Sequence, residues 1–446
     1  MSYKIIDLPD LGRAFNATDI MEVSANGLGS YKVNIGEFTL GGENYIFVNS
    51  NGTPTENGQA VKDAYVAAQA MTPNGAALSE TNRVVILLAP GLYDFDEATY
   101  GPFQVNTSFI DFQSLSGERD VYFSSIDVQS YQVFGINARF SGIDTTVNSY
   151  YGHQAFAICT GGDPNENIVV KNCKGGAYSF SSFSSGFVGT YEDCEATDFS
   201  FVSTGDGIVA PLGISSSGSL DIFNYGTIKN CKSNGFGSFC SSYLWGAASF
   251  ANNYGTIESC VSRDGYSFCY SPYMAYNSGT IISCQSPRNS FVSVSFDGIG
   301  NGQAVNQGTI QYCSATANSS NYSFVSYEGD NLSMDSAINA GLIDSCKAYG
   351  GTSFTINPVV YVGTNYGQMI NCDHLGGGGG FCGSYGTNYG MILQCTSYGT
   401  AFCNLTPSNI NNNIWRCSMV YDSWTTGVTG GGKVVLGIDT TGVVNF

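Results

Sequence analysis

Cysteine is the residue type whose spacing first suggests chemistry in this chain. Of its 15 cysteines, ten end a repeated phrase, GTIxxC or a degenerate form of it: Cys173, Cys194, Cys231, Cys260, Cys284, Cys313, Cys346, Cys372, Cys395 and Cys417. Four more, Cys240, Cys269, Cys382 and Cys403, follow the phenylalanine of a second apolar stretch. Thiols at such regular positions can bind zinc, form disulfides or pack as small hydrophobic side chains.

Packing is the interpretation that the cysteine pattern favours. Zinc sites usually show CxxC knuckles, which are missing here, so no metal site is predicted. Disulfide scaffolds are typically short secreted chains with an even number of cysteines. Side chains of stacked strands run parallel about 4.8 Å apart, whereas a bridge needs Cβ atoms about 3.8 Å apart. We therefore expect a buried structural ladder, with zinc and inter-coil disulfides as the alternatives.

Carboxylates are the second group that could do chemistry. Glycoside hydrolysis needs two of them, about 5 to 9.5 Å apart. The acidic residues near variable corners are Asp206, Asp221, Asp297, Glu328, Asp330, Asp335 and Asp344. Each is most simply a turn residue, and no DxD run suggests a calcium-dependent lyase, so no catalytic residue is assigned. His153 and His374 are too far apart in sequence to suggest a triad and are expected to be structural.

Aromatic residues at the variable corners are the candidate ligand-binding residues. They are Tyr243, Trp245, Tyr270, Tyr273, Tyr276 and Tyr327. Flat rings with a polar edge suit contact with sugars or proteins. The alternative is that these rings stack on one another or pack at an interface between subunits.

The repeat indicates the elements that must hold these side chains. Successive phrase cysteines lie 21, 37, 29, 24, 29, 33, 26, 23 and 22 residues apart, a period typical of a stacked solenoid. The 57 glycines and only 11% charged residues suit short strands and tight turns. A net charge of −19, with scattered basic residues, disfavours nucleic acid as a partner.

Four regions are expected along the chain. Residues 1–42 form a small β attachment unit, a hairpin built from Asp19–Val23 and Tyr31–Ile35. Residues 43–165 hold a capping helix over 56–71, with its N-cap oxygen from Thr55 or Asn57, and the first coils. Residues 166–420 form the repeat body, and residues 421–446 a terminal cap or inter-chain contact. The N-terminus lacks a secretory signal and no apolar run is long enough to span a membrane, so a soluble protein without membrane insertion is expected.

The segment Thr53 to Phe95 (TPTENGQAVKDAYVAAQA…RVVILLAPGLYDF) resembles the entry segment of pectate-lyase-like right-handed parallel β-helices, especially those of bacteriophage tail spikes and tail fibres. The N-terminal KIIDLPDL…DIMEVSANGLGSYKVNIGEF is similar to phage attachment regions. The resemblance implies an all-β, single-stranded right-handed β-helix. It also implies a homotrimer docked through its N-terminus to other tail or baseplate proteins, located in the virion and assembled in the host cytoplasm.

The function expected from these features is that of a structural tail fibre or tail spike subunit. It would bind a host-surface glycan or protein and use no cofactor. Two alternatives remain. One is a polysaccharide depolymerase, either hydrolase or lyase, on the same scaffold. The other is a bacterial surface β-helix adhesin, which the missing signal peptide disfavours.

Overall fold

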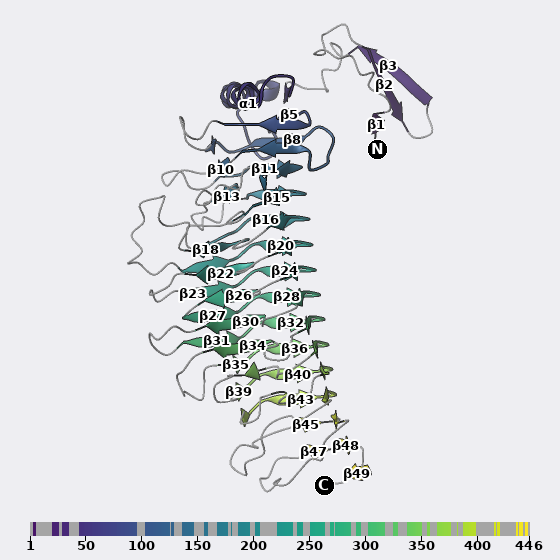
Figure 1. Ribbon diagram of the computed structural model, residues 1–446, viewed down its shortest axis with the longest axis vertical. Helices are drawn as coiled ribbons and strands as arrows, with labels where there is room; N and C mark the ends of the chain where they lie inside the picture. Colours follow the sequence, from purple (N-terminus) through teal and green to yellow (C-terminus); the bar gives the residue numbers. More distant parts are fainter. Residues whose placement is uncertain are drawn as a thin grey trace.

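The computed structural model shows a stack of short parallel strands that begins under one helix (Figure 1). The residues that it describes are 3–5, 20–25, 29–34, 44–95, 103–124, 126–128, 136–146, 156–158, 167–176, 180, 186–196, 201–205, 221–234, 239–243, 250–263, 268–271, 273–286, 291–295, 302–316, 324–328, 337–349, 355–356, 364–375, 381, 387–397, 414–415, 417–419, 434–435, 437–439 and 442–444.

Helix α1 (Pro54–Gln69) closes the N-terminal end of the stack, and its capping differs from the prediction. The helix begins two residues earlier than expected, and its N-cap is Thr53, not Thr55 or Asn57. The Glu56 amide donates to the Thr53 hydroxyl at 3.3 Å, and the Thr53 amide donates to the Glu56 carboxylate at 2.7 Å. This reciprocal pair, followed directly by proline, outcompetes the later caps.

The buried face of α1 covers the coil interior. Its buried side chains include Val61, Ala64, Tyr65 and Ala68, and the helix packs against strands β4, β5, β6 and β8, whose bounds follow below. The side chain of Asn57, which the sequence suggested as a cap, is buried instead. It donates to the carbonyl of Leu92 at 3.0 Å and so ties the helix to the first coil.

Two 15-stranded sheets run the length of the body. Sheet 1 contains β4 (Tyr45–Val48), β5 (Val84–Leu88), β8 (Ile110–Ser114), β11 (Arg139–Ser141), β14 (Val169–Lys171), β16 (Thr190–Glu192), β20 (Thr227–Lys229), β24 (Thr256–Glu258), β28 (Thr280–Ile282), β32 (Thr309–Gln311), β36 (Leu342–Asp344), β40 (Gln368–Ile370), β43 (Met391–Leu393), β45 (Ile414–Trp415) and β47 (Val434–Val435). Sheet 2 contains β6 (Gly91–Tyr93), β9 (Val121–Phe123), β12 (Ile143–Asp144), β15 (Lys174–Gly175), β17 (Glu195–Ala196), β21 (Lys232–Ser233), β25 (Val261–Ser262), β29 (Gln285–Ser286), β33 (Ser314–Thr316), β37 (Lys347–Tyr349), β41 (Asp373–His374), β44 (Thr396–Ser397), β46 (Ser418–Met419), β48 (Gly437–Asp439) and β49 (Gly442–Val444).

Shorter sheets complete the coils. Sheet 3 contains β18 (Ser203–Gly205), β22 (Cys240–Tyr243), β26 (Cys269–Ser271), β30 (Val292–Ser295), β34 (Val325–Glu328) and β38 (Thr355–Ile356). Sheet 4 contains β19 (Ile222–Asn224), β23 (Phe250–Asn253), β27 (Met274–Asn277), β31 (Gln303–Asn306), β35 (Ala337–Asn339), β39 (Thr364–Asn365) and β42 (Thr387–Asn388). In the early coils, β7 (Gln104–Val105), β10 (Ile126–Val128) and β13 (Phe156–Ile158) form a three-stranded sheet.

Strand neighbours come from successive coils and pair in parallel, with Thr256, Thr280 and Thr309 in register. The predicted fold class is therefore confirmed: the chain forms a right-handed parallel β-helix.

Antiparallel pairing is found at the two ends of the chain. The predicted N-terminal hairpin consists of β2 (Ile20–Ala25) and β3 (Gly29–Asn34), with β1 (Tyr3–Ile5) beside β2. At the other end, β48 and β49 pair antiparallel.

The GTIxxC phrase forms the corner between sheets 1 and 2. Its threonine side chain is partly exposed and its isoleucine points inward, as in β28. In nine of the ten phrases the residue before the cysteine is described, and it has positive φ, between 51° and 56°: Asn172, Asp193, Asn230, Ser259, Ser283, Tyr312, Ser345, Asn371 and Gln394. Left-handed backbone is least unfavourable for Asn and Asp, which explains their frequency there.

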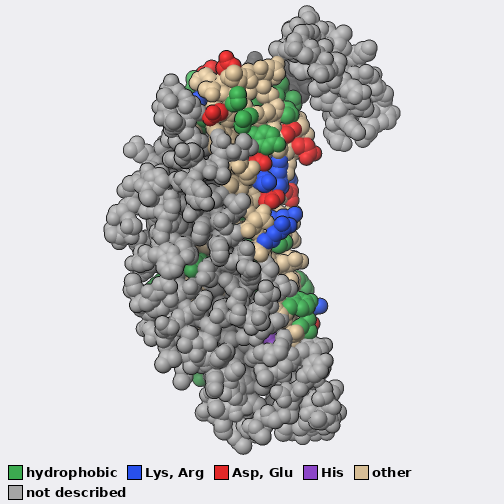
Figure 2. All heavy atoms as spheres, in the orientation of Figure 1, with side chains coloured by type: hydrophobic (Ala, Val, Ile, Leu, Met, Phe, Trp, Pro, Cys, Tyr) green, Lys and Arg blue, Asp and Glu red, His purple; other side chains and the backbone are tan. Residues whose placement is uncertain are grey.

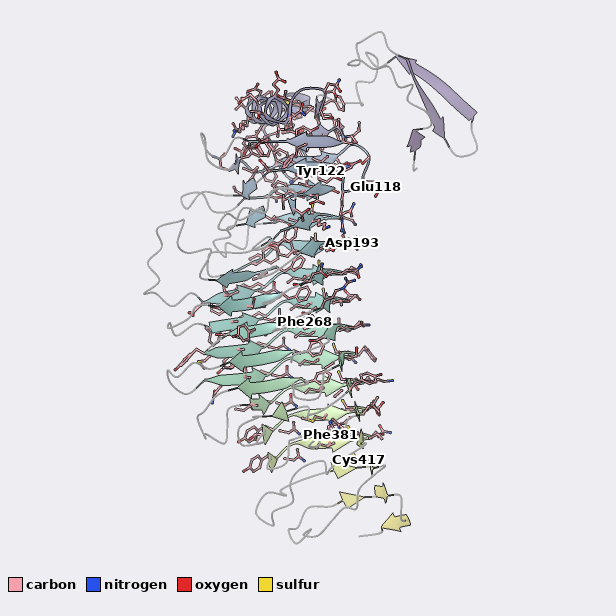
Figure 3. All side chains as sticks on the ribbon, in the orientation of Figure 1. Glu118, Tyr122, Asp193, Phe268, Phe381 and Cys417 are labelled. Atoms are coloured by element: carbon pink, nitrogen blue, oxygen red, sulfur yellow. The ribbon has the colours of Figure 1, made fainter. Side chains whose placement is uncertain are left out.

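Aromatic rings fill the other side of the interior. Six fully buried phenylalanines stack on successive coils: Phe180, Phe201, Phe239, Phe268, Phe291 and Phe324. Their centroids lie 4.6 to 5.3 Å apart with interplanar angles of 10° to 14°. Figure 3 labels Phe268 in the middle of this stack. The "SF" stretches of the sequence thus form a second internal ladder opposite the isoleucines.

Candidate functional site: an aromatic corner

An asparagine ladder supports the corner between sheets 4 and 1. Its members end successive strands of sheet 4: Asn224, Asn253, Asn277, Asn306, Asn339, Asn365 and Asn388. Each side-chain amide donates to the carbonyl oxygen of the next, in six hydrogen bonds of 2.7 to 2.9 Å. All seven side chains are buried. Such a satisfied buried network holds the corner in one conformation.

A glycine column lies two residues after the asparagines and brings neighbouring coils into close contact. A Cβ placed on Gly279 would lie 2.2 Å from the carbonyl oxygen of Gly255, and one on Gly308 would lie 2.1 Å from that of Gly279. Both distances are too short for a real Cβ atom. Only glycine therefore fits at this position while the backbones of neighbouring coils stay this close.

The residue between asparagine and glycine points outward and is tyrosine in four coils. Tyr225 and Tyr254 are 50% and 47% exposed, and their rings stack 5.0 Å apart at 5°. Tyr366 and Tyr389 are 50% and 42% exposed and stack 5.1 Å apart at 8°. Three coils with Ser278, Gln307 and Ala340 at this position separate the two pairs. The coil rise of about 4.8 Å places Tyr366 about 19 Å from Tyr254 along the axis.

Half-buried rings extend the first pair across sheet 4. Phe223 lies 6.1 Å from both Tyr225 and Tyr254 and 5.7 Å from Phe250, and Phe250 stacks on Tyr276 at 5.0 Å and 25°. We call these five rings the aromatic patch. Exposed, contiguous aromatic surface of this kind is typical of recognition sites, because flat rings offer both apolar faces and polar edges.

Partial burial changes the titration of the groups in and beside the patch. It raises the pKa of the Tyr225 and Tyr276 hydroxyls, so both remain neutral hydrogen-bonding groups at neutral pH. It also raises the pKa of Asp221, although the Phe250 amide donates to this carboxylate and acts in the opposite sense. The patch therefore combines neutral hydroxyls with one carboxylate at its edge.

The residues predicted to bind ligand differ in exposure and location. Tyr276 belongs to the aromatic patch, and its hydroxyl lies 3.4 Å from the Gln303 side-chain oxygen. Tyr273, which precedes β27, is half-buried. Tyr270 was expected at an exposed corner, but the structure corrects this, because its side chain is buried within sheet 3 and only 2% exposed.

The other three predicted ligand-binding residues are only partly described, or not at all. Tyr243 and Tyr327 are described by backbone alone, in β22 and β34. Trp245 lies outside the described residues. Of the six, Tyr276 alone contributes a described side chain to the aromatic patch.

The ten phrase cysteines line the interior at the corner between sheets 1 and 2. All are buried free thiols, as are Cys240 and Cys269 of the second column. Cys284 illustrates the pattern: its thiol lies 3.2 Å from its own Ile282 carbonyl and 3.5 Å from the Ile257 carbonyl of the preceding coil. Burial raises the pKa of the Cys173, Cys194 and Cys231 thiols, which keeps them protonated and unreactive.

The acidic candidates that the structure describes do not form a catalytic pair. Asp221 precedes β19 and Asp344 ends β36, four coils further along sheet 1, which corresponds to about 19 Å. Asp206, Asp297, Asp330 and Asp335 lie outside the described residues, and Glu328 is described by backbone alone. The separation of Asp221 from Asp344 exceeds the range of about 5 to 9.5 Å that glycoside hydrolysis requires.

Other acidic side chains are paired with bases. Lys171 contacts Glu192 at 2.9 Å and Lys229 contacts Glu258 at 3.4 Å, along one alternating column of sheet 1. Figure 2 shows positive and negative side chains gathered together along the N-terminal half of the described surface. Nearer the helix, buried Arg83 holds Asp111 with two bonds of 2.6 and 2.7 Å. These pairings neutralise the carboxylates and give them a structural role.

In the described parts of the chain, no group of three or more His, Cys, Asp or Glu side chains is arranged to hold a metal ion. No helix there is both long and apolar enough to cross a membrane.

The sequence contains two further signals of this site. The repeated phrase is longer than GTIxxC: it begins with asparagine two residues before the glycine, as in NYGTIKNC and NYGTIESC. That asparagine column is the support of the corner. The variable residue inside NxG includes the four exposed tyrosines Tyr225, Tyr254, Tyr366 and Tyr389, none of which is among the six predicted ligand-binding residues.

Comparisons with known proteins found no match for the chain among protein-family models, curated proteins or solved structures.

Proposed function

We propose that this protein is a bacteriophage-type tail fibre or tail spike subunit that binds carbohydrate on a host cell surface through the aromatic patch. In this proposal the subunit is a homotrimer, docks to the virion tail through its N-terminal hairpin and assembles in the host cytoplasm. Support comes from the β-helix, from the resemblance of Thr53–Phe95 to tail spike entry segments, and above all from the exposed stacked pair Tyr225 and Tyr254.

The stacked pair favours a sugar ligand for physical reasons. Both rings are about half exposed, yet they are anchored between the asparagine ladder and the glycine column. Because the tyrosine side chains are already held in place, few of their torsions are newly immobilised when a ligand binds, and the entropic cost of binding is lower. The net charge of −19 favours neutral or cationic glycans over acidic ones.

A polysaccharide array tests the proposal. Purified full-length protein is applied to capsular polysaccharides and lipopolysaccharides from many bacteria, beside the double variant Tyr225→Ser/Tyr254→Ser. The matched control is Tyr312→Ser, which removes a 57% exposed tyrosine at the other corner of sheet 1. We expect the double variant to lose at least tenfold in affinity and the control to bind like wild type.

Two results would contradict this assignment. Equal binding by the double variant and the wild type would exclude the patch as the binding site. Normal adsorption to host cells by particles assembled without the subunit would exclude the receptor-binding role itself.

A depolymerase on the same scaffold is the second candidate function. The observation in its favour is Asp221, a carboxyl of raised pKa at the edge of the patch, since a general acid must stay protonated near its working pH. Incubating the bound polysaccharide with wild type and with Asp221→Asn, and measuring new reducing ends, tests it. Release that is lost in the variant supports this candidate; absence of release from every bound polysaccharide excludes it.

A further inference from the structure

His374 is the feature of the described interior that no structural role yet explains. It lies in β41 and is fully buried, and among the described residues neither ring nitrogen has a hydrogen-bond partner. Buried polar groups are nearly always hydrogen-bonded, so an unpaired imidazole of this kind is rare.

The position of His374 makes it an exception within its own column. Strands of sheet 2 pair in register so that inward-facing residues stack on successive coils. Nearer the helix this column holds Tyr93 and Phe123, but its described side chains from Gly175 to Ala348 are small: Gly175, Ala196, Ser233, Ser262, Ser286, Ala315 and Ala348. His374 follows Ala348 directly and is in register with Ser397 of the next coil. One titratable ring thus interrupts a run of small, neutral side chains.

The surroundings of His374 contain no described group that would stabilise a positive charge. From β37 it meets Ala348, while the flanking Lys347 side chain is exposed. In β44 the backbone of Ser397 is in register with it, and the Phe381 ring, labelled in Figure 3, has its centroid 6.5 Å away.

The other titratable groups on the same coils do not compensate a charge on His374. They are Asp373, which is only half-buried on the outward side of β41, Tyr349, which is exposed, and the buried thiols of Cys346, Cys372 and Cys395. A thiol is a weak hydrogen-bonding group, and neither it nor an outward carboxylate compensates a buried imidazolium.

We propose that His374 makes the C-terminal coils of the β-helix an acid-sensitive segment, which opens when the imidazole is protonated while the preceding coils stay closed. Protonation would place an uncompensated charge in the apolar interior. Opening of the coil lets water reach the ring. Because a solenoid is stabilised by contacts between neighbouring coils, one segment can open without the rest.

The direction of the pH dependence follows from linkage. Burial lowers the pKa of His374 to about 4, whereas an exposed histidine has a pKa of about 6.5. The open state therefore binds the proton more tightly. The closed state is most favoured above pH 6.5, loses stability progressively as the pH falls from 6.5 to 4, and loses no more from this group below that.

The ladder cysteines report this opening directly. Full-length protein is exposed to an acid-active pyridyl disulfide at pH 7.5 and pH 4.5, and labelled peptides are quantified by mass spectrometry. We expect the labelling of Cys372 and Cys395 to be on the order of 50-fold greater at pH 4.5 than at pH 7.5, because the open fraction of this segment increases by that factor. Labelling of Cys231 and Cys260, in coils far from His374, should change much less.

Two variants separate the imidazole from the general effects of acid. His374→Ser introduces a residue that other coils carry at this position, and His374→Phe keeps a ring without a titrating group. We expect the acid-induced rise at Cys372 and Cys395 to disappear in both, whatever their stability at pH 7.5. An equal rise in both variants, no rise in wild type, or a rise of the same size at Cys231 would overturn the proposal.

Discussion

The side-chain amide of Asn277 donates a hydrogen bond of 2.8 Å to the side-chain oxygen of Asn306, 29 residues later and one coil further along the helix. Both side chains are fully buried. Asn277 in turn accepts from Asn253 at 2.9 Å. This relay places the outward residue of each NxG corner on a rigid support, and it connects the stability of the rod to the presentation of the exposed tyrosines.

Replacing the middle of this ladder should destabilise the protein strongly. In Asn277→Ala, the Asn253 amide loses its 2.9 Å acceptor and the Asn306 oxygen loses its donor. Each buried group that loses a partner contributes about 1 to 3 kcal/mol, so we expect a loss of about 2 to 5 kcal/mol in urea denaturation. The exposed corner residue Gln307 provides the control, and Gln307→Ala should change stability by less than about 0.5 kcal/mol. A loss equally small in Asn277→Ala would show that the ladder contributes no net stability.

A methyl group in the glycine column should be among the most damaging single changes. In Gly279→Ala the new Cβ would lie 2.2 Å from the Gly255 carbonyl oxygen, so the coils must move apart. We expect a loss of more than about 3 kcal/mol, or failure to fold, against a small effect of the adjacent Ser278→Ala. Thermal melting of both variants measures this. Equal melting temperatures would contradict the close approach of the two coils.

The phenylalanine ladder should behave as a tightly packed core. Phe268 is fully buried between Phe239 at 4.9 Å and Phe291 at 4.6 Å. Truncation to alanine removes contacts on both sides, and we expect a loss of about 3 to 5 kcal/mol. Tyr312→Ala, at an exposed position, serves as the comparison in the same denaturation experiment. If Phe268→Ala were as mild as this control, the coils would have to collapse around the cavity.

The buried thiols should be inert in the native protein at pH 7.5. The twelve described cysteines are free and buried, and burial raises the pKa of Cys173, Cys194 and Cys231. Iodoacetamide should therefore leave these twelve unlabelled over hours in buffer and label all of them in 6 M guanidinium, as mass spectrometry of their peptides would show. A reducing agent should not change the melting temperature. Rapid native labelling or a lowered melting temperature would argue against the free, packed ladder.

The coil architecture was predictable because it depends on local repetition. The GTIxxC phrase recurs with an inward isoleucine and an inward cysteine three residues apart. Strand alternation alone would place them on opposite faces, and the left-handed residue before the cysteine turns the chain so that both point inward. The capping helix was predicted within two residues at each end, because its buried face recurs at helical spacing. Its N-cap was predicted incorrectly, since several polar residues near Thr53 could have served.

The aromatic site was less predictable because exposure depends on the neighbours of a coil. Tyr270 and Tyr276 lie six residues apart and are of the same type, yet the first is buried in sheet 3 and the second is half-exposed on sheet 4. Tyr225 and Tyr254 are 29 residues apart, and nothing in either local segment indicates that their rings stack.

By itself, then, the sequence determined that the chain is a stack of β coils with cysteine and isoleucine inside, because strand alternation and turn preferences act within a few residues. Only the tertiary structure decided which asparagines form one ladder, which tyrosines form exposed pairs and that His374 is buried without a described partner. Those relationships arise from the register between coils more than 20 residues apart, and that register is set by the packing of all the ladders together.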